Sequence, residues 1–235
     1  MTESGICEPV RFIEPAHVTE PTRFTERLRA AAEPNWTAAV THRFTRELLS
    51  GAVAPTVMAR YLIQDHRFLD AFLMLLGAAM ATSDRFEARL RLARFAGLVA
   101  GEENTYFERA FESLGVSAQV RETAPDATAT AGFQALMREA AERGSYAAAL
   151  SVLTVAEWLY LDWASRASHP LPQNFVHHEW ITLHDNPGFR DFVAFLRAEL
   201  DRVGPDDPEL CEDLFGRAVA LERAFFDAAY ADEIR

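Results

Sequence analysis

Apolar residues recur with a helical period along almost the whole of this chain. Side chains three and four positions apart share one face of a helix, so such a period predicts amphipathic helices. No segment shows the sustained alternation of a strand, and no internal repeat is visible. The expected helical segments are 21–32, 34–50, 55–82, 84–114, 127–143, 146–167, 187–203 and 207–232. The sequence therefore predicts an all-α fold, a compact multi-helix bundle.

Breaks in the period separate these segments. The stretch 168–174 holds two prolines, which the interior of a helix does not tolerate. Gly115 is expected to end a helix, and Ser83-Asp84 to cap the start of one. Residues 1–20 show no clear period. We therefore expect residues 1–20 to form an N-terminal arm and residues 21–235 a single helical domain.

Composition excludes several classes of protein. A net charge of −12 argues against binding to nucleic acid or to anionic membrane surfaces. The longest apolar run, 68–81, is too short to span a membrane and carries Asp70. All 23 basic residues are arginine, which excludes Schiff-base chemistry and phosphate loops that depend on lysine. Since no export signal is visible and the chain has 2 cysteines, we expect a cytoplasmic protein.

Three acidic residues occupy helix faces that are otherwise apolar. Glu157 lies in 151-SVLTVAEWLYLDWA-164, and Asp65 and Glu222 lie in similar aromatic stripes of two other segments. An unpartnered ionised carboxylate there costs several kcal/mol, so an arginine or a hydroxyl commonly satisfies a single buried acid. If the three acids instead converge, burial and repulsion raise at least one pKa and create a proton donor. Periodicity alone leaves both arrangements open.

The remaining polar candidates give weaker signals. His177 and His178 lie in a stretch expected to be a loop, where solvated or capping roles are favoured over metal binding. Glu102 and Glu103 have no histidine at helical spacing, so we expect a solvated face rather than a carboxylate–histidine iron site. His184 either lines a site or fixes the loop before residue 187. The sequence predicts no metal site.

The chain resembles the thiaminase II (TenA) family, which has a haem-oxygenase-like helical fold but binds no haem. The likeness extends from about Phe24 to Tyr230. Four segments carry it: 36-WTAAVTHRFTRELLSG-51, 61-YLIQDHRFL-69, 155-VAEWLY-160 and 221-LERAFFDAAY-230. The resemblance implies a small-molecule pyrimidine substrate, no cofactor, and a homo-oligomer, either a tetramer or a dimer.

The resemblance also implies roles for single residues. Asp65 falls where the family's aspartate hydrogen-bonds the aminopyrimidine, and Glu222 where a late glutamate handles the proton of the leaving group. Further substrate-binding residues are implied on the same basis: Tyr61, Phe68, Tyr160, His184 and Phe225.

The family has branches with and without a catalytic cysteine, and the departures of this chain from the family pattern indicate which branch it resembles. The better-known branch has a cysteine nucleophile where this chain has Ala156, and Phe68 and His184 replace two tyrosines. A branch without the cysteine, often called TenA_E, carries a glutamate one residue later, as Glu157 does. The resemblance implies hydrolysis of aminomethyl- or formylaminomethyl-pyrimidine from thiamin breakdown, in thiamin salvage. Glu157 and Glu222 would be the catalytic residues, with Glu157 favoured as base and Glu222 as acid.

Two other functions stay open on the sequence. A metal-dependent or cofactorless oxidase shares the haem-oxygenase-like fold, although the helical Glu-x-x-His pattern of iron sites is missing. The alternative is a non-catalytic protein that binds a pyrimidine or another small ring, because Ala156, Phe68 and His184 could mark a site that has drifted.

Overall fold

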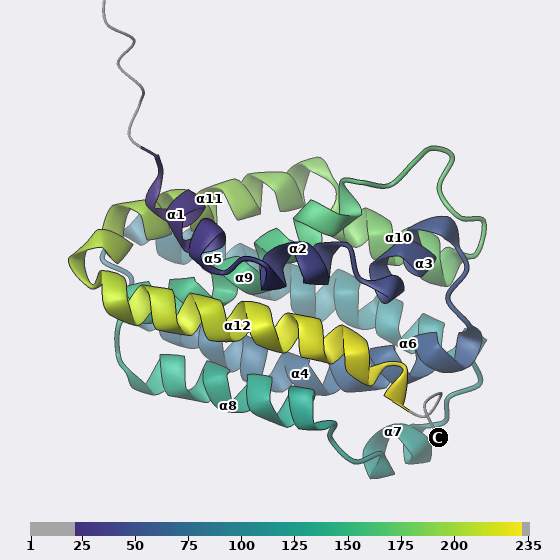
Figure 1. The fold of residues 1–235 in the computed structure, drawn as a ribbon. Helices are drawn as coiled ribbons and strands as arrows, with labels where there is room; N and C mark the ends of the chain where they lie inside the picture. The colour runs from purple at the N-terminus through teal and green to yellow at the C-terminus, as the bar shows by residue number, and fades with distance from the viewer. Residues whose placement is uncertain (1–21, 232–235) are drawn as a thin grey trace, which may run out of the picture.

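The computed structural model describes residues 22–231, and within that range it contains helices and turns but no strand. The elements follow the chain (Figure 1) as α1 (Phe24–Ala31), α2 (Asn35–Val40), α3 (Arg43–Ser50), α4 (Pro55–Thr82), α5 (Phe86–Leu98), the π-helical turn η1 (Val99–Glu103), α6 (Asn104–Ser113), α7 (Ala118–Thr123), α8 (Thr128–Glu142), α9 (Tyr146–Ala164), α10 (Phe175–His184), α11 (Pro187–Val203), the 3-10 turn η2 (Gly204–Asp206) and α12 (Pro208–Ala228). The all-α prediction is confirmed. The expected arm, 1–20, lies outside the described residues. None of these helices is both long enough and apolar enough to cross a membrane.

Helix α9 forms the centre of the bundle. Its residues are buried except for Leu161 and Asp162, and α4, α8, α11 and α12 pack against it. In Figure 1, α12 crosses the front of the bundle, α11 runs along its top and α8 along its bottom. A helix that is enclosed on all sides must be apolar around its whole circumference, which the sequence of α9 provides. A polar side chain on α9, such as Glu157, is therefore held inside the core.

Large aromatic side chains fix the surrounding helices. Phe44 on α3, Phe107 on α6 and Phe215 on α12 are each 0% exposed and belong to the same buried cluster. Burying a phenylalanine side chain contributes about 1.5–3 kcal/mol relative to its exposure. Distant segments of the chain are thus held against one core.

Side-chain caps set where two central helices begin. The hydroxyl of Ser145 accepts the N–H of Ala148 at the start of α9, over 3.3 Å. The side-chain oxygen of Asn186 accepts the N–H of Phe189 over 2.9 Å, and Pro187 occupies the first turn of α11. Such caps contribute about 1 kcal/mol each and fix the register of the helix.

Two expected segments are interrupted in the structure. The segment 34–50 divides into α2 and α3, because the His42 imidazole accepts the N–H of Phe44 over 3.0 Å and starts a new helix there. The segment 84–114 contains the π-helical turn Val99–Glu103 between α5 and α6. The other expected segments match helices of the structure, with ends that differ by a few residues.

The predicted breaks have mixed outcomes. Gly115 ends its helix with φ +68°, a conformation that favours glycine, and no helix runs through 168–174. The predicted cap at Ser83-Asp84 is wrong. The N-cap of α5 is Arg85, and its N–H donates to the hydroxyl of Ser83, which follows the last residue of α4.

Helices α7 and α10 were not expected. His177 and His178, predicted to lie in a loop, belong to the first turns of α10. The signal was present, because the buried residues Val176 and Trp180 are spaced by four and Asn174 caps the helix by accepting the N–H of Val176 over 3.0 Å. The prolines just before Asn174 predicted a loop, and that prediction was extended too far along the chain.

Candidate active site

A cavity of about 250 Å³ lies at the meeting point of α4, α5, η1, α8, α9, α10, α11 and α12. Seven of the residues singled out by the sequence line it: Asp65, Phe68, Glu157, Tyr160, His184, Glu222 and Phe225. Tyr61 does not line it. The Tyr61 side chain lies behind the wall, where its hydroxyl oxygen is 2.8 Å from that of Tyr160.

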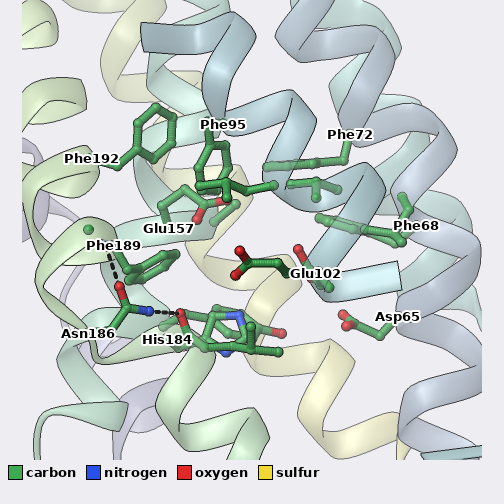
Figure 2. Close-up of a pocket in the computed structure, with 18 of the residues that line it drawn as sticks. Asp65, Phe68, Phe72, Phe95, Glu102, Glu157, His184, Asn186, Phe189 and Phe192 are labelled. Carbon is green, nitrogen blue, oxygen red and sulfur yellow. Dashed lines mark hydrogen bonds between the residues drawn. The ribbon is translucent and has the colours of Figure 1, made fainter. Parts of the chain in front are cut away.

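The three acids meet in this cavity from three different helices. Asp65 on α4 is 6% exposed, Glu157 on α9 is 7% exposed and Glu222 on α12 is 2% exposed. Figure 2 shows the Asp65 and Glu157 carboxylates at the same hollow. In the part of the chain that the structure describes, none of the three has an ion pair or a hydrogen bond to a side chain. The alternative in which an arginine satisfies each acid is therefore wrong.

A fourth carboxylate, Glu103, joins them. The expectation of a solvated face is wrong for Glu103, which is half-buried and lines the cavity, whereas Glu102 is exposed and lies at the edge of the same cavity. Leu92 and Val99 belong to the buried stripe of this helix, and Glu103, four residues after Val99, continues it. The same spacing could have identified Glu103 from the sequence. Its turn is π-helical, a local geometry that occurs frequently at functional sites.

Burial raises the pKa of every carboxyl group in this cluster, and repulsion between the groups adds to the effect at three of them. Burial raises the pKa of Glu103 to about 7. Burial raises the pKa of Asp65 well above its usual value, and the charge of Glu103 raises it further. The pKa of Glu157 is raised by burial, then by Glu103 and Asp65, and that of Glu222 by burial, then by Asp65 and Glu157. Four coupled carboxyls therefore hold protons near neutral pH and can both donate and accept them.

Aromatic rings form the apolar walls of the cavity. The Phe68 ring lies 5.0 Å from the Phe133 ring and 6.4 Å from the Phe225 ring, measured between centroids. Figure 2 shows Phe68 on one side of the hollow and Phe189 on the other. Such walls suit a planar, apolar-faced ring. The sequence did not single out Phe133 or Phe189, since the spacing of core phenylalanines does not reveal which of them face a cavity.

His184 contributes a neutral imidazole to the wall. Burial lowers its pKa to about 4, although a hydrogen bond to the Trp180 carbonyl acts in the opposite direction. That bond is 2.8 Å long and joins Nδ1 to a carbonyl oxygen, which can only accept. The proton therefore resides on Nδ1, and Nε2 remains a hydrogen-bond acceptor.

Among the described residues, no group of three or more histidine, cysteine, aspartate or glutamate side chains is arranged to hold a metal ion. An iron-dependent oxidase would require such a group.

Comparison with known proteins places the chain in context. The profile of the TENA/THI-4/PQQC family matches residues 29–232. A relative named aminopyrimidine aminohydrolase, from Halalkalibacterium halodurans, is 21% identical over 222 residues, which cover 90% of this chain and 97% of the relative.

Solved structures agree on the fold. A TenA family transcription regulator from Silicibacter sp. TM1040 superposes with a TM-score of 0.78 at 20% identity, covering 88% of this chain and 96% of that one. A domain of unknown function with a haem-oxygenase-like fold, from Shewanella denitrificans, has a TM-score of 0.60 at 16% identity, covering 89% and 93%. The expected haem-oxygenase-like fold is confirmed.

Proposed function

The chain belongs to the TENA/THI-4/PQQC family, and we propose that it is an aminopyrimidine aminohydrolase of thiamin salvage. Its substrate would be aminomethyl-pyrimidine or the formylaminomethyl derivative. One observation carries this proposal: Asp65, Glu157 and Glu222 are buried, have no partner among the described side chains and line one aromatic-walled cavity. The aminohydrolase name of a distant relative that covers most of the chain is consistent with it.

Substrate binding follows from the walls and from Asp65. An aminopyrimidine ring is flat, so it can lie against the rings of Phe68 and Phe225. Its exocyclic amino group and adjacent ring nitrogen form a two-point edge that matches the two oxygens of a carboxyl group. Asp65 would hold that edge and thereby fix the ring with its substituted methylene carbon towards the glutamates.

The reaction then needs one base and one acid. Glu157, ionised, would take a proton from a water molecule while the water oxygen forms a bond to the methylene carbon. The carbon–nitrogen bond breaks, its electron pair goes to nitrogen, and Glu222, protonated, donates a proton to the departing nitrogen. Where the amine binds as an ammonium ion, Glu222 would first accept that proton from it, so that the amine reacts in its neutral form. The free amine leaves as ammonia, or the formyl derivative as formamide, and both give hydroxymethyl-pyrimidine. Proton exchange between the two glutamates restores the starting state.

The branch without a catalytic cysteine is part of this proposal. Ala156, which the resemblance aligns with that cysteine, lines the cavity. Cys211 is fully buried, and its thiol donates to the Gly204 carbonyl oxygen over 3.7 Å. Cys211 is absent from the cavity wall, whereas Glu157, next to Ala156, is part of it. A carboxylate is therefore the better candidate for activating water.

A parallel mass-spectrometric assay tests the proposal. The purified protein is incubated separately with thiamin, aminomethyl-pyrimidine and formylaminomethyl-pyrimidine, and hydroxymethyl-pyrimidine is quantified over time. We expect turnover of at least one of the two aminomethyl compounds and much slower cleavage of thiamin. Binding without any product would favour the non-catalytic alternative, and faster cleavage of thiamin than of both other compounds would contradict the proposed branch.

A further inference from the structure

Glu103 has no role in the reaction just described, yet it belongs to the same carboxylate cluster. We propose that Glu103 makes the cavity selective for a cationic ligand, so that the free aminomethyl-pyrimidine, an ammonium ion, is bound in preference to neutral pyrimidines. This inference rests on the proposed function, because it assumes that a pyrimidine occupies the cavity. It assigns a specificity-determining role to the π-helical turn.

The position of Glu103 supports this role. The side chain is half-buried, lines the cavity and has no ion pair or hydrogen bond to another described side chain. Its charge acts on Asp65 and on Glu157, whereas Glu222 responds to Asp65 and Glu157 instead. Glu103 thus acts electrostatically on the proposed ring-binding acid and on the proposed base.

Three neighbouring acids are nine-tenths buried and likewise unpartnered. Asp65, Glu157 and Glu222 reach the same hollow as Glu103. Four carboxyl groups in one enclosed space repel one another when ionised, so an empty cavity must retain protons. An ammonium group replaces those protons as the source of positive charge and can donate up to three hydrogen bonds. A neutral ligand offers no such compensation.

The basic groups near the cavity do not cancel this charge. Arg91 and Arg94, on α5, belong to the lining, but Arg94 is exposed and Arg91 is paired with Asp191 of α11. His184 is neutral, because burial lowers its pKa to about 4. The inner part of the cavity is therefore acidic, and its outer part is of mixed charge.

Equilibrium binding at pH 7 tests the inference without relying on turnover. Isothermal titration calorimetry compares the cationic aminomethyl-pyrimidine with the neutral hydroxymethyl-pyrimidine in Glu157→Gln, which the proposed mechanism makes inactive, and in the double variant that also carries Glu103→Gln. We expect Glu157→Gln to favour the cation by about tenfold or more, and the double variant to lose most of that preference through weaker binding of the cation. Glutamine keeps the shape of the side chain, and circular dichroism verifies the fold.

Two further variants make the comparison specific. Glu108→Gln removes the same charge from an exposed position on α6, and it should leave the preference unchanged. Glu103→Asp keeps the charge and should retain a preference for the cation. All variants are compared in the Glu157→Gln background, and equal affinity of that background for both ligands, or an unchanged ratio when Glu103→Gln is added, would overturn this inference alone. Failure of both pyrimidines to bind would overturn it together with the proposed function.

Discussion

The hydroxyl groups of Tyr61 and Tyr160 share a hydrogen bond of 2.8 Å that joins α4 to α9 one turn away from the acidic cluster. Tyr61 precedes Asp65 by four residues, and Tyr160 follows Glu157 by three, so each tyrosine lies on the same helix face as one of these acids. The two carboxyl groups come from different helices, and this bond fixes the spacing between those helices.

Loss of that bond should therefore affect stability. In Tyr61→Phe the Tyr160 hydroxyl loses its hydrogen-bond partner. Tyr160 is only 7% exposed, so its hydroxyl has little access to water. We expect the free energy of unfolding to fall by about 1–3 kcal/mol, since a buried hydroxyl without a partner bears its full desolvation cost. Urea denaturation measures the change. The double variant with Tyr160→Phe should lose less than the sum of the two single losses, and strict additivity would contradict direct coupling.

Removal of either proposed catalytic carboxyl should reduce turnover more than binding. Glu157→Gln and Glu222→Gln keep the size of the side chain but cannot exchange a proton. We expect kcat to fall by roughly 100-fold or more, with KM changed only a few-fold. Steady-state kinetics on aminomethyl-pyrimidine measures both constants. Full activity in Glu157→Gln would exclude it as the base, and full activity in Glu222→Gln would exclude it as the acid.

The acidic cluster should make the folded protein less stable as pH rises. The pKa of Glu103 increases from 4.5 to about 7 because the group is buried. Between these values the folded chain binds more protons than the unfolded chain, so the free energy of unfolding decreases as pH rises. The raised pKa values of Asp65 and Glu157 act with the same sign.

Glu103→Gln should flatten this pH dependence. Thermal unfolding of the wild type and the variant, followed in steps between pH 4.5 and pH 7, gives the two slopes. We expect the wild type to lose stability more steeply with increasing pH than the variant does. Parallel curves would mean that Glu103 titrates alike in the folded and unfolded chains.

Assembly into a homo-oligomer, either a dimer or a tetramer, stays a prediction, and exposed apolar side chains on α4 and α5 are candidates for its interface. Phe86 is 65% exposed, Leu90 40% and Met74 41%. Exposed apolar side chains that gather into one patch commonly mark interfaces. We propose that this surface contributes to one. Light scattering after size exclusion should show an oligomer that Phe86→Glu shifts towards smaller species, whereas a monomeric wild type would contradict the proposal.

The sequence revealed the acids because each of them interrupts an apolar stripe. Asp65, Glu157 and Glu222 have helical neighbours that are nearly all apolar, and that contrast needs no knowledge of packing. Glu103 continues such a stripe as well, but its acidic neighbour Glu102 made the pair look solvated. The absence of a histidine at helical spacing argues against a metal site there, but it does not indicate whether Glu103 is buried.

Other features depend on contacts between distant segments. Phe95 of α5 stacks on Phe192 of α11 with their centroids 3.7 Å apart, and both rings line the cavity. Helical spacing predicts that each is buried, but only the packing of α5 against α11 decides that they form one wall. The position of Tyr61 behind the cavity has the same origin, because it depends on which helix lies opposite α4.

The enclosure of α9 has a consequence for how a ligand reaches the acids. Since that helix is covered by its neighbours, no path leads to Glu157 from its own side of the bundle. The exposed residues of the cavity wall, Arg94, Leu98, Glu102, Gly188 and Asp191, all come from α5, the π-helical turn and α11. The cavity therefore opens to solvent between α5 and α11, and the Arg91–Asp191 ion pair connects these two helices at the opening. We therefore expect ligands to approach the buried carboxyls beside this ion pair.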